Sequence, residues 1–150
     1  MTRALIRIAS IAAMLALATG QAGAARGVHH LSGGGTASIS QVAMNVTFTS
    51  SGSASGSFVC LMAGRSAFVL GDFGLHHNMI VHATPISGSV TGSTATFKGV
   101  GTLILDGRKK MSNIHVQVSV NTAAQSFQLT VVEVGTLPVE TLETGHLTLR

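Results

Sequence analysis

The chain has 150 residues, of which 9% are charged, and its formal net charge is +4 at pH 7. Only five residues are acidic, so the positive balance reflects few acids, and Arg108-Lys109-Lys110 is the one basic cluster. There is no Trp and no Tyr. The composition therefore excludes the broad basic stripe and the aromatic platforms of a typical nucleic-acid-binding protein.

Residues 1–24 have the pattern of a secretory signal peptide helix. Arg3 and Arg7 precede an apolar run from Ile8 to Ala18, and Ala22-Gly23-Ala24 fits the small-x-small cleavage site. The run is shorter than the ~20 apolar residues that a membrane-spanning helix needs. We therefore expect cleavage after Ala24, a secreted or periplasmic location, and no transmembrane segment in the mature chain.

The segment after the cleavage site has two predicted parts. Residues 25–32 show no apolar period and predict a flexible lead-in, in which His29-His30 is solvated. Gly33-Gly34-Gly35 then marks the entry to a single domain over residues 33–150. Beyond the glycines the apolar residues recur with a period of two, which is typical of a half-buried strand. They are Val42, Met44, Val46 and Phe48.

Ser50 to Gly56 predicts a turn, and Phe58 to Met62 predicts a short strand that is apolar on both faces. This strand contains Cys60, the only cysteine, so an internal disulfide is excluded. We expect a buried thiol, and a disulfide to another chain is the alternative. Met79 to Ile86 predicts the next strand, and Pro85 indicates an edge or a bulge at its end.

The following segment is rich in turn and strand patterns. Gly88-Ser89 and Gly92-Ser93 predict turns, and Asp106-Gly107 predicts a hairpin. Gly99 and Gly101 interrupt one apolar face and permit a bend there. The apolar positions that alternate in the remaining chain are Ala95, Phe97, Leu103, Leu105, Ile114, Val116, Val118, Val120, Phe127, Leu129, Val131, Leu147 and Leu149.

No segment after Ala25 has the period of an amphipathic helix. About seven or eight short strands separated by Gly, Ser and Asn predict an all-β fold. We expect a single antiparallel β-sandwich or a closed β-barrel over residues 33–150.

The stretch Val90 to Leu103, VTGSTATFKGVGTL, resembles a group of small exported all-β domains of bacteria and archaea that have no assigned function. Val116-Gln117-Val118, Phe127-Gln128-Leu129 and the closing Gly145 to Leu149 extend the resemblance over the C-terminal half. The resemblance implies secretion and an all-β fold. It implies no activity, no cofactor and no catalytic residue. Members of the group usually carry Asp where this chain has Asn121, which puts an ion-binding role for that turn in doubt.

His76, His77 and His82 are the densest group of metal-ligand residue types in the chain. On a strand, positions an odd number apart face opposite sides, so His77 and His82 diverge, and His76 and His82 lie roughly 20 Å apart. One strand therefore cannot supply two ligands. A loop site completed by His115 or His146 is left open, but no local spacing matches a zinc motif. We expect no bound metal.

No catalytic constellation is visible in the sequence. Gly52 to Gly56 has Ala54 where a nucleophile elbow needs serine, and Ile104 replaces the third glycine of a dinucleotide loop. Of the carboxylates, Asp72 with Glu133 is the pair left open for acid–base chemistry. Glu140 and Glu143 lie after Pro138 and are expected in a solvated loop. We expect no enzyme activity.

Two hypotheses for the function remain, and a third has weaker support. The first is a secreted non-catalytic β-domain that is a structural or interaction module. The sequence does not identify its partner, which we expect to be another protein or a cell-surface component. We expect it to bind no nucleic acid and no cofactor. The second is a carrier barrel for a small apolar ligand, which would require a void of a few hundred Å³ inside the fold. The third is a metal-binding protein built on His76, His77, His82 and His115.

Overall fold

The computed structural model describes residues 27–64 and 78–150, which contain strands and no helix. The strands form one antiparallel sheet of ten members in the order β10-β1-β2-β3-β4-β5-β6-β7-β8, and β9 pairs with β7. Their bounds are β1 His29–Thr36, β2 Gln41–Phe48, β3 Ala54–Met62, β4 Met79–Thr91, β5 Thr94–Leu105, β6 Lys109–Asn121, β7 Ser126–Val131, β8 Gly135–Thr136, β9 Glu140–Thr141 and β10 His146–Leu149. The predicted all-β class and antiparallel pairing are confirmed. Over the described ranges, no helix is long and apolar enough to cross a membrane.

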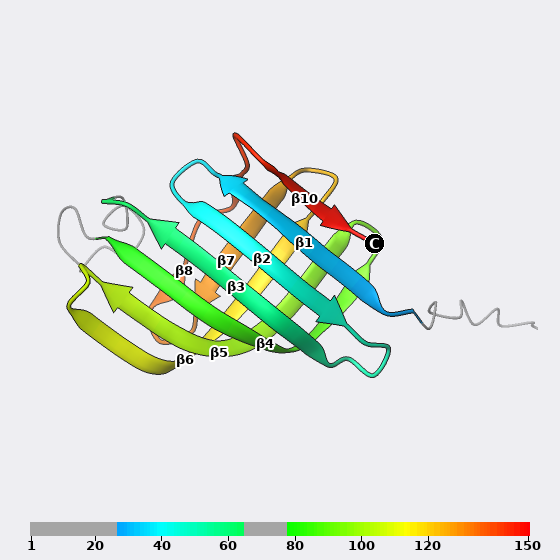
Figure 1. Ribbon diagram of the computed structural model, residues 1–150, viewed down its shortest axis with the longest axis horizontal. Helices are drawn as coiled ribbons and strands as arrows, with labels where there is room; N and C mark the ends of the chain where they lie inside the picture. The colour runs from blue at the N-terminus through cyan, green and yellow to red at the C-terminus, as the bar shows by residue number, and fades with distance from the viewer. Residues whose placement is uncertain (1–26, 65–77) are drawn as a thin grey trace, which may run out of the picture.

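The sheet is curled, so that one continuous ladder makes both layers of the fold. In Figure 1, β10 and β1 to β4 lie in front, and β6 to β8 cross behind them. The three strands β4, β5 and β6 have 13, 12 and 13 residues and carry the bend. They are longer than the short strands predicted from the sequence. The fold is therefore a single curled sheet of more strands than the seven or eight expected.

Two register shifts bend the long strands. One falls between Pro85 and Ser87, which leaves Ile86 as an extra residue in β4. The other leaves Asn113, at φ 59°, as an extra residue in β6 opposite Gly101. A bulge of this kind strengthens the local twist and bends the strand. The prediction of a bulge at Pro85 is confirmed, whereas Gly88-Ser89 lies inside β4 and is not a turn.

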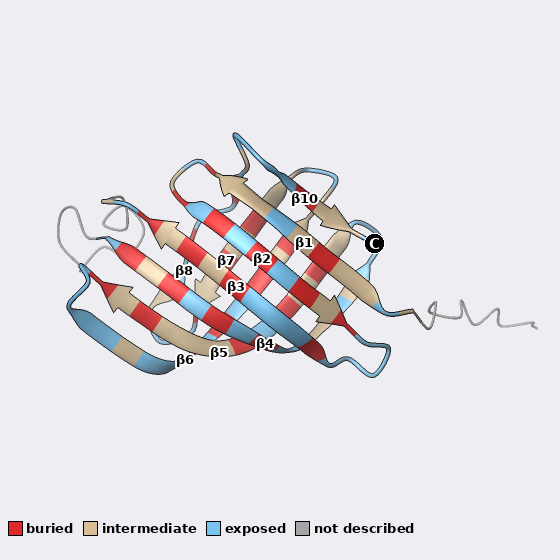
Figure 2. Cartoon of the chain, in the orientation of Figure 1, coloured by how far each residue is buried: buried red, intermediate tan, exposed pale blue. Residues whose placement is uncertain are grey.

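Side chains alternate between the core and the outer surface along almost every strand (Figure 2). In β2 the predicted apolar positions are buried and those between them are exposed or half-buried. In β6, Ile114, Val116, Val118 and Val120 are 0–2% exposed, which confirms the predicted inward parity. Four phenylalanines fill the middle of the core, and two of the ring pairs are in contact. They are Phe48, Phe58, Phe97 and Phe127.

The two ends of the curled sheet are joined by side-chain and loop contacts. The Gln125 amide donates to Leu147 O at 3.0 Å, and Leu147 N–H donates to Gln125 Oε1 at 2.7 Å. This side chain satisfies the backbone groups of an edge strand, as a neighbouring strand would. A further antiparallel bridge joins Ala37 to Leu142. The chain from β9 to β10 thus fastens the β7 side of the curl to β1.

Strand β1 begins at His29, so the assignment of residues 29–32 to a flexible lead-in is wrong. These residues pair with β2 on one side and β10 on the other, and Leu31 is fully buried. The glycine run belongs to the same strand. A Cβ added at Gly34 would lie 2.2 Å from Val42 O, and one added at Gly35 would lie 1.8 Å from Thr144 O. The glycines are needed because the neighbouring backbones leave no room for a side chain.

Candidate functional site

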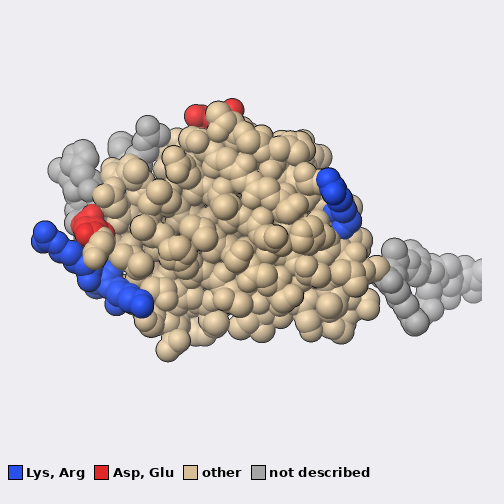
Figure 3. All heavy atoms as spheres, in the orientation of Figure 1, with Lys and Arg blue, Asp and Glu red and all other residues tan. Residues whose placement is uncertain are grey.

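The outward-facing side chains of β10, β1, β2, β3 and β4 form a surface that we call the neutral face. None of these five adjacent strands contains Asp, Glu, Lys or Arg. Figure 3 shows this side of the molecule, with charged atoms confined to its margins. Only 9% of the residues in the sequence are charged, and the strand order places the five strands without charged residues next to one another.

Two kinds of side chain make up the neutral face. In the middle, hydroxyl and amide groups stand in cross-strand rows, such as Ser32 beside Asn45 and Asn45 beside Ser57. Toward the end of the sheet where β2 begins, the rows become apolar, and half-buried Leu61 pairs with half-buried Ile80. The face therefore offers donors and acceptors at its centre and an apolar region at one end.

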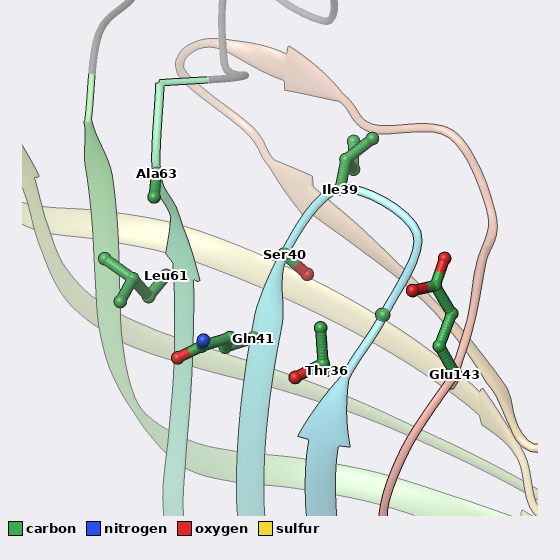
Figure 4. Close-up of a pocket in the computed structure, with 8 residues that line it drawn as sticks. Thr36, Ile39, Ser40, Gln41, Leu61, Ala63 and Glu143 are labelled. Carbon is green, nitrogen blue, oxygen red and sulfur yellow. The ribbon is translucent and has the colours of Figure 1, made fainter.

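A hollow lies at the apolar end of the neutral face (Figure 4). It consists of two adjoining pockets of about 240 and 450 Å³ that share Thr36, Gln41 and Leu61. Figure 4 shows Leu61 and Ala63 on one side and Glu143 on the other. In the described residues its lining combines an apolar wall with hydroxyl and amide groups and one carboxylate, that of Glu143. This composition suits an anchoring side chain or a small polar group of a partner.

A buried polar cluster supports the wall of the hollow. Glu140 is 1% exposed, and its Oε2 accepts hydrogen bonds from Ser40 Oγ at 2.8 Å and Ile39 N–H at 3.1 Å. Its Oε1 is buried and has no hydrogen-bond partner within the described ranges. The expectation that Glu140 lies in a solvated loop is wrong, because β9 pairs with β7 and turns this side chain inward against the β1–β2 loop. No sequence pattern indicated that burial.

Cys60 lies in the same region and is fully buried as a free thiol, as predicted. Burial raises the pKa of the Cys60 thiol to about 12, the Ser40 hydroxyl lowers that pKa, and the charge of Glu140 raises it. A thiol with this pKa is protonated at neutral pH, and the thiolate is the reactive form. Cys60 is therefore a buried core residue whose thiol is protonated at neutral pH.

We expect a thiol reagent such as 5,5′-dithiobis(2-nitrobenzoate) to label Cys60 of the native protein only as fast as unfolding exposes the thiol. Burial and the raised pKa both keep the thiolate from the reagent. The measurement is the labelling rate of Cys60 in buffer and in denaturing urea. Labelling within seconds in buffer would contradict the buried position.

We expect Glu140→Ala to lower the free energy of unfolding by about 1–3 kcal/mol, because Ser40 Oγ and Ile39 N–H lose their buried acceptor. Glu140→Gln keeps an acceptor oxygen, so its loss should be smaller. Urea denaturation measures both. Glu143→Ala is the matched control, since Glu143 is exposed. Equal stability of the Glu140→Ala and Glu143→Ala variants would show that the cluster contributes nothing.

The structure places two of the predicted metal-ligand candidates, His82 and His115, apart from each other. His76 and His77 lie outside the described residues, as does Asp72. His82 is exposed on the outer side of β4, opposite Val59 and Thr102. His115 lies two strands away in a different cross-strand row, roughly 10 Å or more from His82. In the parts of the chain that are described, no three His, Cys, Asp or Glu side chains are grouped to hold a metal ion.

His115 is instead paired with Glu133. Its ring Nδ1–H donates to Glu133 Oε1 at 2.6 Å, and its backbone N–H lies 3.0 Å from both carboxylate oxygens. Desolvation raises the pKa of Glu133, but the hydrogen bonds from His115 together lower it more, so the net pKa is below its ordinary value. A lowered carboxylate pKa contributes stability above the ordinary pKa, and this contribution is lost as the pH falls through the lowered value. The Glu133 carboxylate thus accepts hydrogen bonds from the backbone and the ring of His115, which lies on β6.

Comparison of the sequence with protein-family models, with curated proteins and with solved structures gives no match.

Proposed function

We propose that this protein is an exported, non-catalytic interaction module that binds a protein or another cell-surface component through the neutral face. The single observation that carries the proposal is the absence of charged residues from five adjacent strands. A typical soluble globular domain has about 25% charged residues. The core of a protein interface, in contrast, is depleted in Lys, Glu and Asp.

The hollow beside Leu61 and Gln41 gives the neutral face a place for an anchoring group. Binding energy at interfaces is concentrated where a side chain fills a pocket from which water is excluded. The surrounding hydroxyl and amide rows supply hydrogen-bonding groups without the cost of desolvating a charge. A polar sheet face without charged residues, beside a hollow that has an apolar wall and the Glu143 carboxylate on one side, suits a partner that is largely uncharged.

The buried side chains favour this proposal over a carrier. A carrier barrel needs an interior void for its ligand. Here the inward positions are occupied by four buried phenylalanines and by aliphatic side chains from β2 to β7. The hollows described above lie on the outer surface, where they suit contact with a partner.

The residues with reactive groups also favour a role in binding. Cys60 is buried and its thiol has a raised pKa, and the Glu133 carboxylate accepts a hydrogen bond from the His115 ring. Glu140 is buried in a cluster with Ser40 that faces the core. None of these groups stands opposite a nucleophile and a base in a cleft, which is the arrangement that catalysis requires.

Export is the part of the proposal that rests on Arg3, Arg7 and Ala22-Gly23-Ala24. We expect expression of the full chain in a bacterial host to yield material in the periplasm or the medium that begins at Ala25. N-terminal sequencing of that material is the measurement. A protein recovered outside the cytoplasm that still begins at Met1 would contradict the cleavage site.

Binding is tested by co-sedimentation of the mature domain with the envelope fraction of the producing cells. We expect retention that saturates with increasing domain concentration. Protease treatment of the envelope separates the two kinds of partner, because retention is lost for a protein partner and kept for a polysaccharide. Retention that rises linearly without saturation in both preparations would overturn the proposal.

A further inference from the structure

A second hollow of about 300 Å³ lies on the outer surface of β4, β5 and β6, away from the hollow of the neutral face. We call it the Lys98 groove. Its polar lining consists of Ser87, Ser89, Thr96, Lys98 and Gln117. Among the described residues that line it, Lys98 is the only charged one. The volume is at the lower end of the range for small-molecule sites.

Strand register places these side chains in two rows. Lys98 pairs with Ser87 of β4 on one side and with Gln117 of β6 on the other. In the next row Ser89 pairs with Thr96, and their hydroxyl oxygens are 3.1 Å apart. Adjacent strands are about 4.8 Å apart and same-face residues of one strand are about 7 Å apart. The polar groups therefore surround an area comparable to one sugar ring.

Two of these groups, the Lys98 ammonium and the Gln117 amide, have no side-chain partner among the described residues. Within residues 27–64 and 78–150, neither the Lys98 ammonium nor the Gln117 amide makes a side-chain hydrogen bond or an ion pair. Glu133 lies in the turn after β7, and its carboxylate already accepts hydrogen bonds from His115 of β6. Lys98 thus remains available to an anion.

We propose that the Lys98 groove binds an acidic sugar, with the carboxylate of a uronic acid unit paired to Lys98. The Gln117 amide and the hydroxyls of Ser89 and Thr96 supply donors and acceptors for the ring hydroxyls. Among the described residues that line the groove, the one aromatic residue, Phe97, is 1% exposed, so a neutral sugar has no ring there on which to stack. The charge on Lys98 is therefore what selects the ligand.

This inference goes beyond the proposed function and does not depend on it. The two surfaces share Ser87 and Ser89 of β4, but the charge of the groove comes from Lys98 of β5 and its amide from Gln117 of β6, which lie outside the neutral face. Either surface can bind when the other does not.

The test is a titration of ¹⁵N-labelled mature domain with sodium glucuronate, with methyl glucoside and sodium acetate as separate probes. We expect saturable shifts for the amides around Lys98 and Gln117 with glucuronate, at a Kd in the millimolar range. The same concentrations of methyl glucoside and acetate should bind at least tenfold more weakly. Raised salt should weaken the binding of glucuronate, because an exposed ion pair is screened.

Variants then separate the groove from general attraction to a cation. Lys98→Gln should weaken glucuronate binding at least tenfold, and Lys98→Arg should retain it. Lys110→Gln is the matched control, since Lys110 is an exposed lysine of β6 outside the groove. Three results would overturn the proposal. They are a lack of saturable shifts, acetate binding equal to that of glucuronate, and equal effects of Lys98→Gln and Lys110→Gln.

Discussion

We expect Val118→Asp to unfold the domain or to lower its free energy of unfolding by more than about 4 kcal/mol, the range in which single substitutions become exceptional. Val118 is 0% exposed and pairs with Phe97 and Leu129 in the middle of the ladder. A carboxylate there would be buried with no partner, and an unpaired buried charge is costly. Urea denaturation followed by circular dichroism measures the loss.

Gln117→Asp is the matched control, because Gln117 is the adjacent residue of β6 and faces solvent. The same change at this exposed position should cost less than about 1 kcal/mol, as surface substitutions usually do. Similar midpoints for Val118→Asp and Gln117→Asp would mean that the inward parity of β6 is wrong.

The second large effect is expected at the glycine run of β1. Gly35→Ala should destabilise the domain by about 3 kcal/mol, the upper part of the usual range for overpacking. The added Cβ would lie 1.8 Å from Thr144 O and 2.7 Å from Thr144 C, so the backbone before β10 would have to move. Because this segment fastens the end of the sheet to β1, the disturbance should spread to the pairing of β10.

Thermal unfolding compares Gly35→Ala with Gly27→Ala. A Cβ at Gly27 would meet only the His29 ring at 3.8 Å, an ordinary contact, so this control should unfold at the wild-type temperature. A Gly35→Ala variant that unfolds at the same temperature as Gly27→Ala would show that the segment before β10 is not held closely against β1.

The alternation of apolar and polar residues was sufficient to predict most strands and their inward faces. The predicted residues are buried in Val42 to Phe48 and in Ile114 to Val120, because successive side chains of a strand point to opposite faces and every second residue therefore faces the core. The buried state of Cys60 followed from its apolar neighbours. Asp106-Gly107 is a hairpin turn in the structure, with φ values of 50° and 66° and a hydrogen bond from Arg108 N to Leu105 O.

The errors arise where tertiary contacts override local composition. Glycines usually indicate a turn or an entry loop, so the strand at Gly33-Gly34-Gly35 and the continuation of β4 through Gly88 were missed. In the structure both segments are strands. Glycine is needed in them because neighbouring backbones or the Phe48 ring occupy the place of a side chain. The burial of Glu140 depends on the β1–β2 loop, about a hundred residues away in the sequence.

Neither candidate binding surface was identifiable from the sequence. The low charge of the chain was visible, but the pairing of β10 with β1, which adds a fifth strand to the neutral face, was not. The Lys98 groove likewise needs the register that places Ser87, Lys98 and Gln117 side by side. Register between strands is set by the whole sheet, and no local pattern of these residues predicts it.

The measurement that tests the neutral face most directly is co-sedimentation with the envelope fraction for Ala43→Lys, Ser57→Lys and Ser112→Lys. All three positions are exposed, and the first two lie on the neutral face, whereas Ser112 lies outside it on β6. We predict that Ala43→Lys and Ser57→Lys weaken saturable retention at least tenfold, because each places an uncompensated charge within the interface, and that Ser112→Lys leaves it unchanged. Equal retention of the three folded variants and the wild type would contradict binding through the neutral face.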